Sequence, residues 1–207
     1  MALEPINIVN RACARIGIDP IESFADEFAG TKAGQIYDAL VEFCLGVYGF
    51  SWGQKMVALT RLSEASTLGF DYVYQLPGDR LGPPLRLSDD AANAHPDFAR
   101  YTLSEDKVHT SAAAVYALIK FKPDPALWSA PFAEVVTLAL AGDLAFMFAD
   151  DGNTQAQYLE RAFGAPQEQC RGGAMAVAIN EDARATPPRR LPQGNDPFTR
   201  AHNGAWR

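Results

Sequence analysis

The sequence predicts an α+β protein that is mainly helical: a four-helix bundle with an antiparallel β insertion and an extended C-terminal arm. Three observations lead to this fold class. Apolar residues recur every three or four positions near both ends of the expected folded part, as in amphipathic helices. In the middle, apolar and polar residues alternate, as in half-buried strands. The last 24 residues contain four prolines and no apolar run at either spacing, which disfavours a helix there.

The N-terminal region, residues 1–66, is predicted to contain two helices. The first ends at Gly17, and its apolar stripe consists of Ile6, Val9, Cys13 and Ile16. The second begins near Thr31, and its stripe consists of Ile36, Leu40, Phe43 and Val47. Phe43 is therefore expected in the core. Trp52, which comes after this helix, is expected in the core between the helices.

The middle region, residues 67–122, is predicted to be an antiparallel β insertion. Residues 70–76 alternate in polarity, and "PLRLSD" forms a second short strand. The stretch "ARYTLSEDKVHTS" reads as two strands around a Ser-Glu-Asp turn. The run "AAVYALIKF" is ambiguous between helix and strand. Pro123 and Pro125 come shortly after it, and this favours a strand.

The C-terminal helical region, residues 123–182, is predicted to complete the bundle. Its first helix has Ser129 as the N-cap and a wide apolar stripe that includes Phe132 and Leu140, two expected core residues. The next helix is expected to begin at an Asn153 N-cap and to break or kink at Pro166. Two consecutive glycines weaken the last helical stretch, which extends to about residue 179. The arm, residues 183–207, comes last.

Composition indicates an ordinary globular protein of 207 residues, with 48% hydrophobic and 21% charged residues. No apolar run reaches the ~18–20 residues that a membrane span needs, and no secretion signal is visible. Cys13, Cys44 and Cys170 are widely spaced and odd in number, which favours reduced, buried thiols over disulfides or a metal site. We therefore expect a protein that folds in a cytoplasm and does not contact membranes.

The charge is unevenly spread along the chain. From residue 183 onward there are five arginines and one acid, whereas the preceding body carries 13 basic and 24 acidic side chains. A protein that reads DNA sequence would show a basic face on its folded part. The distribution instead suits a basic tail that seeks an acidic or carbonyl-rich partner surface.

The sequence contains no recognisable catalytic, cofactor or metal motif, so none of these sites is predicted. The three histidines, His95, His109 and His202, are expected at the surface. The acid pairs Asp89-Asp90 and Asp150-Asp151 are candidate cation ligands. Neither register from Asp150 or Asp151 has the glycine and glutamate that a calcium loop requires, which favours a turn between helices. A carboxylate pair for glycoside hydrolysis stays open, because the sequence does not give distances between acids.

Three segments, taken in order, resemble the tail tubular protein A group of phage head-to-tail adaptors. The first two are "INIVNRACARIGIDPIESF" and "YDALVEFCLGVYGFSWGQKMVALTRL", with the aromatic-x-Trp pattern at Phe50 and Trp52. The third, "GFDYVYQLPGDRL", is a Tyr-rich strand that closes on Leu-Pro-x-Asp. Further on, "FKPDPALWSAPFAEVVTLALAGDLAFMFADD" is similar to the family's Asp-Pro, Trp or Phe, and Ala-rich helix. The resemblance extends to about residue 179 and rests on the order of the motifs.

The resemblance implies a structural, non-enzymatic role in the virion neck. Adaptors of this group form a ring, typically of twelve subunits, between the portal protein and the downstream tail or stopper protein. Genomic DNA passes through the ring without sequence-specific contact. The particles are assembled in the cytoplasm of the infected cell.

If the chain is such an adaptor, the C-terminal arm is expected to dock on the portal protein. Arg189 and Arg190 would pair with portal carboxylates, while Leu191, Phe198 and Trp206 would anchor in portal grooves. Arg200 is also assigned to this docking arm. An arm that folds back on its own subunit is the alternative. Two other functions also stay open: a tail-associated peptidoglycan hydrolase, and a monomeric helical interaction module.

Overall fold

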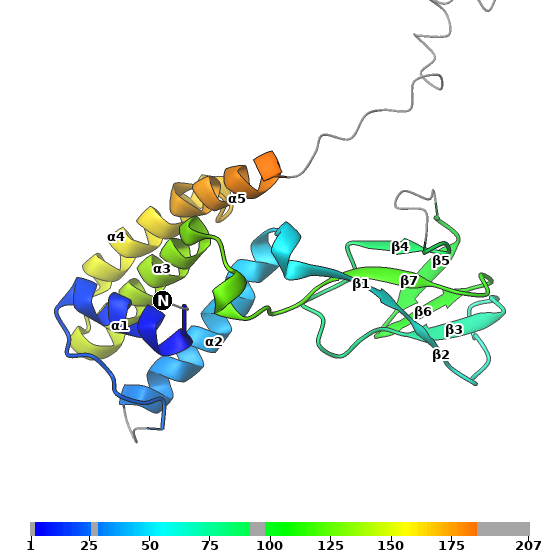
Figure 1. Cartoon of the computed structure of the whole chain (residues 1–207), viewed down its shortest axis with the longest axis horizontal. Coiled ribbons are helices and arrows are strands. Elements are labelled where there is room, and N and C mark those ends of the chain that lie inside the picture. Colours follow the sequence, from blue (N-terminus) through cyan, green and yellow to red (C-terminus); the bar gives the residue numbers. More distant parts are fainter. Residues whose placement is uncertain (1–2, 26–28, 92–97, 186–207) are drawn as a thin grey trace, which may run out of the picture.

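The computed structural model describes residues 3–25, 29–91 and 98–185. These residues form two lobes (Figure 1). All five helices lie in one lobe, here called the helical lobe, and all seven strands lie in the other, the β lobe. The chain leaves the helical lobe after the second helix and returns to it before the third. The β lobe is therefore an insertion in a helical protein.

The helical lobe is built from five α-helices. Their bounds are α1 (Pro5–Ile16), α2 (Ala29–Val47), α3 (Ala130–Ala149), α4 (Gly152–Phe163) and α5 (Gly173–Ala185). Three single-turn 3₁₀ helices lie where the chain changes direction. They are η1 (Ser51–Gly53), η2 (Pro125–Leu127) and η3 (Pro166–Glu168).

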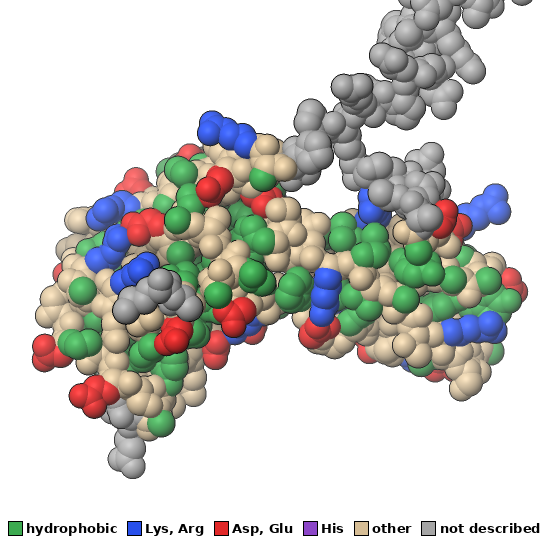
Figure 2. All heavy atoms as spheres, viewed as in Figure 1, with side chains coloured by type: hydrophobic (Ala, Val, Ile, Leu, Met, Phe, Trp, Pro, Cys, Tyr) green, Lys and Arg blue, Asp and Glu red, His purple; other side chains and the backbone are tan. Residues whose placement is uncertain are grey.

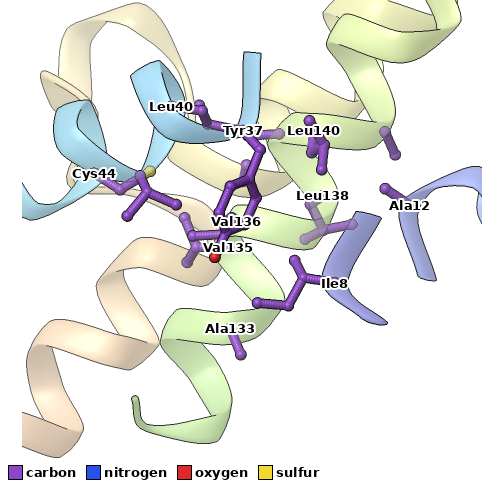
Figure 3. Packing of buried hydrophobic residues seen from close by; sticks show 14 of the residues in the cluster. Ile8, Ala12, Tyr37, Leu40, Cys44, Ala133, Val135, Val136, Leu138 and Leu140 are labelled. Carbon is purple, nitrogen blue, oxygen red and sulfur yellow. The ribbon is translucent and has the colours of Figure 1, made fainter. Parts of the chain in front are cut away.

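Helix α3 is the centre of the helical lobe, because α1, α2, α4 and α5 all pack against it. Twelve of its 20 residues are buried, including Phe132 and Leu140, which are fully buried. Figure 3 shows Ile8 and Ala12 of α1 and Tyr37, Leu40 and Cys44 of α2 facing this helix. A helix that is apolar all round belongs inside a protein, where neighbours cover every side.

Helix α3 is also long and apolar enough to cross a membrane by length and composition. In this structure, 67% of its most apolar window is buried by the rest of the protein. Core helices of soluble proteins share this composition, so the helix is only weak evidence for a membrane span.

Local signals in the sequence explain where the helices start and stop. Gly17 adopts a left-handed conformation (φ 74°) at the end of α1, and its N–H donates to the Cys13 carbonyl. The Ser129 hydroxyl accepts a hydrogen bond from the Phe132 N–H and so caps α3. Asp151 caps α4 in the same way, by accepting from the Thr154 N–H at 2.9 Å. Both predictions for Gly17 and Ser129 are confirmed.

The β lobe contains two antiparallel sheets. One has the order β1-β7-β4 and the other the order β2-β3-β6-β5. The strands are β1 (Gln54–Ala58), β2 (Thr60–Arg61), β3 (Tyr72–Gln75), β4 (Arg86–Ser88), β5 (Tyr101–Ser104), β6 (Lys107–Thr110) and β7 (Tyr116–Lys120). The ambiguous run thus forms a strand, as predicted, and so does the pair around the Ser-Glu-Asp turn.

The β lobe has a hydrophobic core of its own, separate from the core of the helical lobe. Side chains from both sheets meet there: Tyr74 and Val108 from one, Leu87, Ala117 and Ile119 from the other. The Tyr74 hydroxyl donates to the Ala112 carbonyl at 2.8 Å, so that this large buried side chain leaves no unpaired polar atom.

The predicted fold class is wrong in the balance of its parts. The structure is not a mainly helical four-helix bundle: it has five helices, and its seven strands form two sheets of three and four. Two boundaries account for much of the difference. The β part begins at Gln54, 13 residues before the predicted residue 67, and the last helix continues to Ala185, into the predicted arm.

Two local predictions in the C-terminal helices are also corrected. The N-cap of α4 is Asp151 instead of Asn153, which lies inside the helix. The paired glycines do not weaken a helix: Gly173, with φ 53°, is the residue at which α5 begins. An added Cβ there would lie 2.5 Å from the Arg161 carbonyl oxygen, so this tight turn between α4 and α5 requires a glycine.

Candidate interaction surfaces

Two chain segments cross between the lobes, and they run side by side. Residues 48–54 lead out of the helical lobe, and residues 120–128 lead back. The Phe121 N–H donates to the Gly53 carbonyl at 3.1 Å and links the two. The junction is therefore the place where the structure sets the position of one lobe relative to the other.

An aromatic cluster anchors both crossings in the helical lobe. Trp52 stacks on Phe50 with ring centroids 5.0 Å apart and meets Phe132 edge-on at 4.9 Å. Trp128, from the returning segment, meets the same Phe132 ring edge-on at 5.0 Å. Phe132 thus joins three aromatic residues from the two crossings. The buried Nε1 atoms of Trp52 and Trp128 have no hydrogen-bond partner among the described residues.

The predicted core residues differ in burial. Phe132 and Leu140 have no exposed surface, and Trp52 is partly buried against the helical core. Phe43 is not a core residue, since 49% of its surface is exposed. It lies on the edge of the apolar stripe of α2, where its ring meets Phe163 edge-on at 5.7 Å. Periodicity identified the apolar stripe but did not show that its edge extends beyond the neighbouring helices.

An apolar groove of about 480 Å³ lies close to Phe43, between α4 and the turn after it. Its lining residues are mainly apolar, with Glu160 as the charged one: Ala156, Leu159, Glu160, Phe163, Gly164, Ala165, Pro166 and Cys170. Together with Phe43, the groove forms apolar surface that the described residues of the chain leave uncovered. Such surface is typical of sites that contact another protein.

The two lobes differ sharply in charge. Residues 1–53 and 123–182 carry five basic and 16 acidic side chains, whereas residues 54–122 carry eight of each. The net negative charge of the body therefore belongs to the helical part, where Figure 2 shows acidic side chains scattered over the visible face. An acidic surface repels nucleic-acid phosphates and attracts basic partner segments.

The β lobe has two more polar hollows, both beside the loop that connects β2 and β3. One of about 210 Å³ includes Glu64, Lys107 and His109 in its lining. Glu64 and Lys107 form an ion pair at 2.9 Å, and His109 Nδ1 lies 2.8 Å from Ser66 Oγ. The second hollow, lined in part by Arg61 and Asp71, has about 520 Å³.

The distance between Ser66 Oγ and His109 Nδ1 would suit a catalytic nucleophile and its general base. Two features favour a structural role instead. The Ser66 hydroxyl also accepts a hydrogen bond from the Leu68 N–H, which closes a turn of the loop. In the described part of the chain, no carboxylate hydrogen-bonds to His109 to orient its ring. His109 is buried, which corrects the expectation that it lies at the surface.

The acidic pairs that the sequence singled out have structural explanations. Asp151 caps α4, and Asp150 ends α3 in a left-handed conformation (φ 52°), so this pair makes a turn between helices, as favoured. Ser88 Oγ accepts from the Asp90 N–H and donates to the Asp90 carbonyl, which forms a local turn. Within the described ranges, no three His, Cys, Asp or Glu side chains gather as metal ligands would.

Sequence reasoning did not identify the polar contacts between α2 and the returning segment. Lys120 Nζ donates to the Gly46 carbonyl at 2.8 Å, and Lys122 Nζ pairs with Asp38 at 2.7 Å and Glu42 at 3.7 Å. The spacing of the residues in the sequence is consistent with these contacts. Positions 38, 42 and 46 share one face of a helix, and positions 120 and 122 share one side of an extended chain.

The predicted arm contacts lie almost entirely outside the described residues. Residues 183–185 belong to α5, and the named arm residues all come after them: Arg189, Arg190, Leu191, Phe198, Arg200 and Trp206. No protein family matches this chain, and a search of curated proteins finds no significant match. The resemblance to the phage adaptors therefore stays an interpretation of the sequence.

Proposed function

We propose that this chain is a structural subunit of the neck of a phage or phage-like particle. Copies of the chain form a ring between the portal protein and the downstream tail or stopper protein, and DNA passes through the ring. On this proposal the protein is assembled in the cytoplasm of the infected cell and ends in the virion.

The observation that carries the proposal is the convergence of the motifs on which the resemblance rests. The aromatic-x-Trp motif ends the segment that leaves the helical lobe, and the Asp-Pro and Trp motif lies in the segment that returns. Trp52 and Trp128 both contact Phe132, on the Ala-rich helix α3. Motifs separated by about 70 residues thus form one structural unit, which explains why they occur together.

Two properties of the surface support a ring around DNA. A ring subunit must bury apolar surface against its neighbours, and the groove with Phe43 is apolar surface that stays exposed among the described residues. The acidic helical part, repeated around a ring, would repel DNA phosphates instead of binding them, so that DNA can slide.

The test is the mass of the purified protein, alone and mixed with the portal of its particle, by native mass spectrometry. We expect a ring, or a monomer that forms a ring only on the portal. The Phe43→Ser variant should assemble poorly and stay folded, because its side chain is half exposed. The matched control is Leu127→Ser, which removes a 60% exposed side chain far from the groove in sequence. A monomer that ignores the portal contradicts the proposal.

The hydrolase alternative makes a different prediction. It requires activity on host cell wall, which zymography detects directly, and a carboxyl with a raised pKa in a cleft. Burial raises the pKa of Asp143, but this carboxylate accepts a hydrogen bond from Gln155 and does not line any of the three hollows described above. No described feature favours the hydrolase over the adaptor.

A further inference from the structure

The angle between the lobes is set at the junction. Each lobe has its own hydrophobic core, and no helix packs broadly against a strand in the described part of the chain. Without a shared core, the two crossing segments and their side chains carry the connection.

The outgoing segment is firmly anchored. Phe50 is buried and Trp52 packs on two aromatic rings. Between them, Ser51 donates its N–H and its hydroxyl to the buried carboxylate of Asp182, on α5. Moving this segment would disrupt the core of the helical lobe.

The returning segment is held differently, by two lysines along one face of α2. Lys120, the last residue of β7, is hydrogen-bonded to the Gly46 carbonyl near the end of α2. Lys122 lies further into the helical lobe and pairs with Glu42 and Asp38, which lie one and two turns back from Gly46 along the same face. The side chains of Asp38 and Glu42 are 64% and 55% exposed, so water and salt reach this pair.

The chain immediately after Lys122 is stiff. Pro123 and Pro125 restrict the backbone, and the Asp124 carboxylate accepts from the Ala126 N–H. Because β7 runs directly into this stiff segment, the direction in which the segment lies on α2 sets the direction of the β lobe (Figure 1).

We propose that Lys122 is an electrostatic latch for the β lobe. While Lys122 is paired with Asp38 and Glu42, the returning segment lies along α2 and the lobes hold one angle. When the pair is released, the β lobe turns about the junction, where the Lys120–Gly46 hydrogen bond and the outgoing segment stay in place. A basic surface of a partner that competes for the two carboxylates would release the latch. In a neck ring, this would let the β lobes adjust to the tail while the helical lobes keep their contacts.

The test measures the distance between the lobes in the full chain. Spin labels at Thr67→Cys, in the β lobe, and Gln157→Cys, on α4, in a Cys170→Ser background report the distance distribution. We expect a narrow distribution at low salt. At ~1 M salt, where the Debye length falls to about 3 Å and dissolved ions compete for these exposed charges, it should broaden and its mean should shift. Lys122→Met should give the broad distribution at low salt.

Two variants serve as controls. Lys107→Met removes an ion pair of similar exposure that lies within the β lobe, and it should keep the narrow distribution. Lys122→Arg keeps the positive charge, so this variant should also give the narrow distance distribution. If Lys122→Met fails to fold, the salt titration of the unaltered chain decides. A distribution that is insensitive to salt, or equal in Lys122→Met and Lys107→Met, overturns the latch. This outcome is independent of ring formation, so it leaves the proposed function to its own test.

Discussion

The carboxylate of Asp182 accepts hydrogen bonds from two groups of Ser51: the backbone N–H, at 3.0 and 3.1 Å from its two oxygens, and the hydroxyl, at 2.6 Å. The two residues are 131 positions apart, and Asp182 is only 7% exposed. This contact ties α5 to the point where the chain leaves the helical lobe.

Replacing Asp182 should destabilise the protein clearly. Asp182→Ala removes the buried, charged acceptor of the Ser51 N–H and hydroxyl. Because Ser51 is itself exposed, water replaces part of these hydrogen bonds, and the loss should be about 1–2 kcal/mol of unfolding free energy. Denaturant unfolding followed by circular dichroism measures the loss. Glu181→Ala, on the adjacent exposed position of the same helix, is the matched control and should change the stability by less than about 0.5 kcal/mol. Equal effects of the two variants would contradict this role.

Trp52 should contribute through packing. Its indole contacts Phe50 and Phe132 at the junction, so Trp52→Ala should cost on the order of 3–5 kcal/mol. Trp52→Phe should cost much less, because the indole N–H has no partner to lose among the described residues. Thermal and denaturant unfolding test both. A loss under about 1 kcal/mol for Trp52→Ala would mean that the ring behaves as a surface residue.

Substitutions at two glycines should distinguish the cost of a left-handed backbone from the cost of steric crowding. Gly17 and Gly173 both have positive φ, but a Cβ on Gly17 meets nothing within 4 Å, whereas one on Gly173 meets the Arg161 carbonyl oxygen at 2.5 Å. Gly17→Ala should therefore cost about 1 kcal/mol, for the left-handed conformation alone. Gly173→Ala should cost about 3 kcal/mol, because the backbone must also move. Comparable losses in unfolding experiments would show that the turn yields easily.

Much of the fold can be derived from local signals. The helix ends at Gly17 and Ser129 could be predicted, since each depends on one residue and its own backbone. The strand at residues 116–120 could be predicted because the prolines after it limit its length. β1 was missed because the sequence 54–58 comes directly after a helix and alternates only weakly. Asp151 was missed as a cap because two acids and an asparagine lie together there, and each can cap a helix.

The candidate surfaces were harder to predict, because they depend on residues that are distant in the sequence. Apolar spacing placed Phe43 in the core, but its exposure depends on where α4 ends. The latch depends on Lys122 lying beside Asp38, 84 residues away. Spacing indicates which residues share a face, and only the packing of elements decides which faces meet.

Stability should depend on the ionisation of Asp143. Burial raises the pKa of this carboxyl, so the folded state holds the proton more tightly than the unfolded state. The protonated carboxyl contributes its full share to the free energy of unfolding below the ordinary aspartate pKa of about 4. This contribution is lost as the pH rises through the raised pKa of the folded state. Asp143→Asn keeps an oxygen for Gln155 and carries no charge, so it should raise the Tm at neutral pH. The gain should vanish near pH 3, and a gain independent of pH would contradict the cause.

Deleting residues 187–207 should separate folding from assembly. The two hydrophobic cores are built from residues that come before residue 180, so we expect the truncated chain to stay folded. If this segment docks on the portal, as its arginines and aromatic residues suggest, the truncated protein should no longer attach to filled heads. Sedimentation of heads mixed with either protein measures attachment. Replacing Arg189 and Arg190 by glutamate in the full chain should weaken attachment in the same way, whereas normal attachment of the truncated chain would assign portal binding to the body instead.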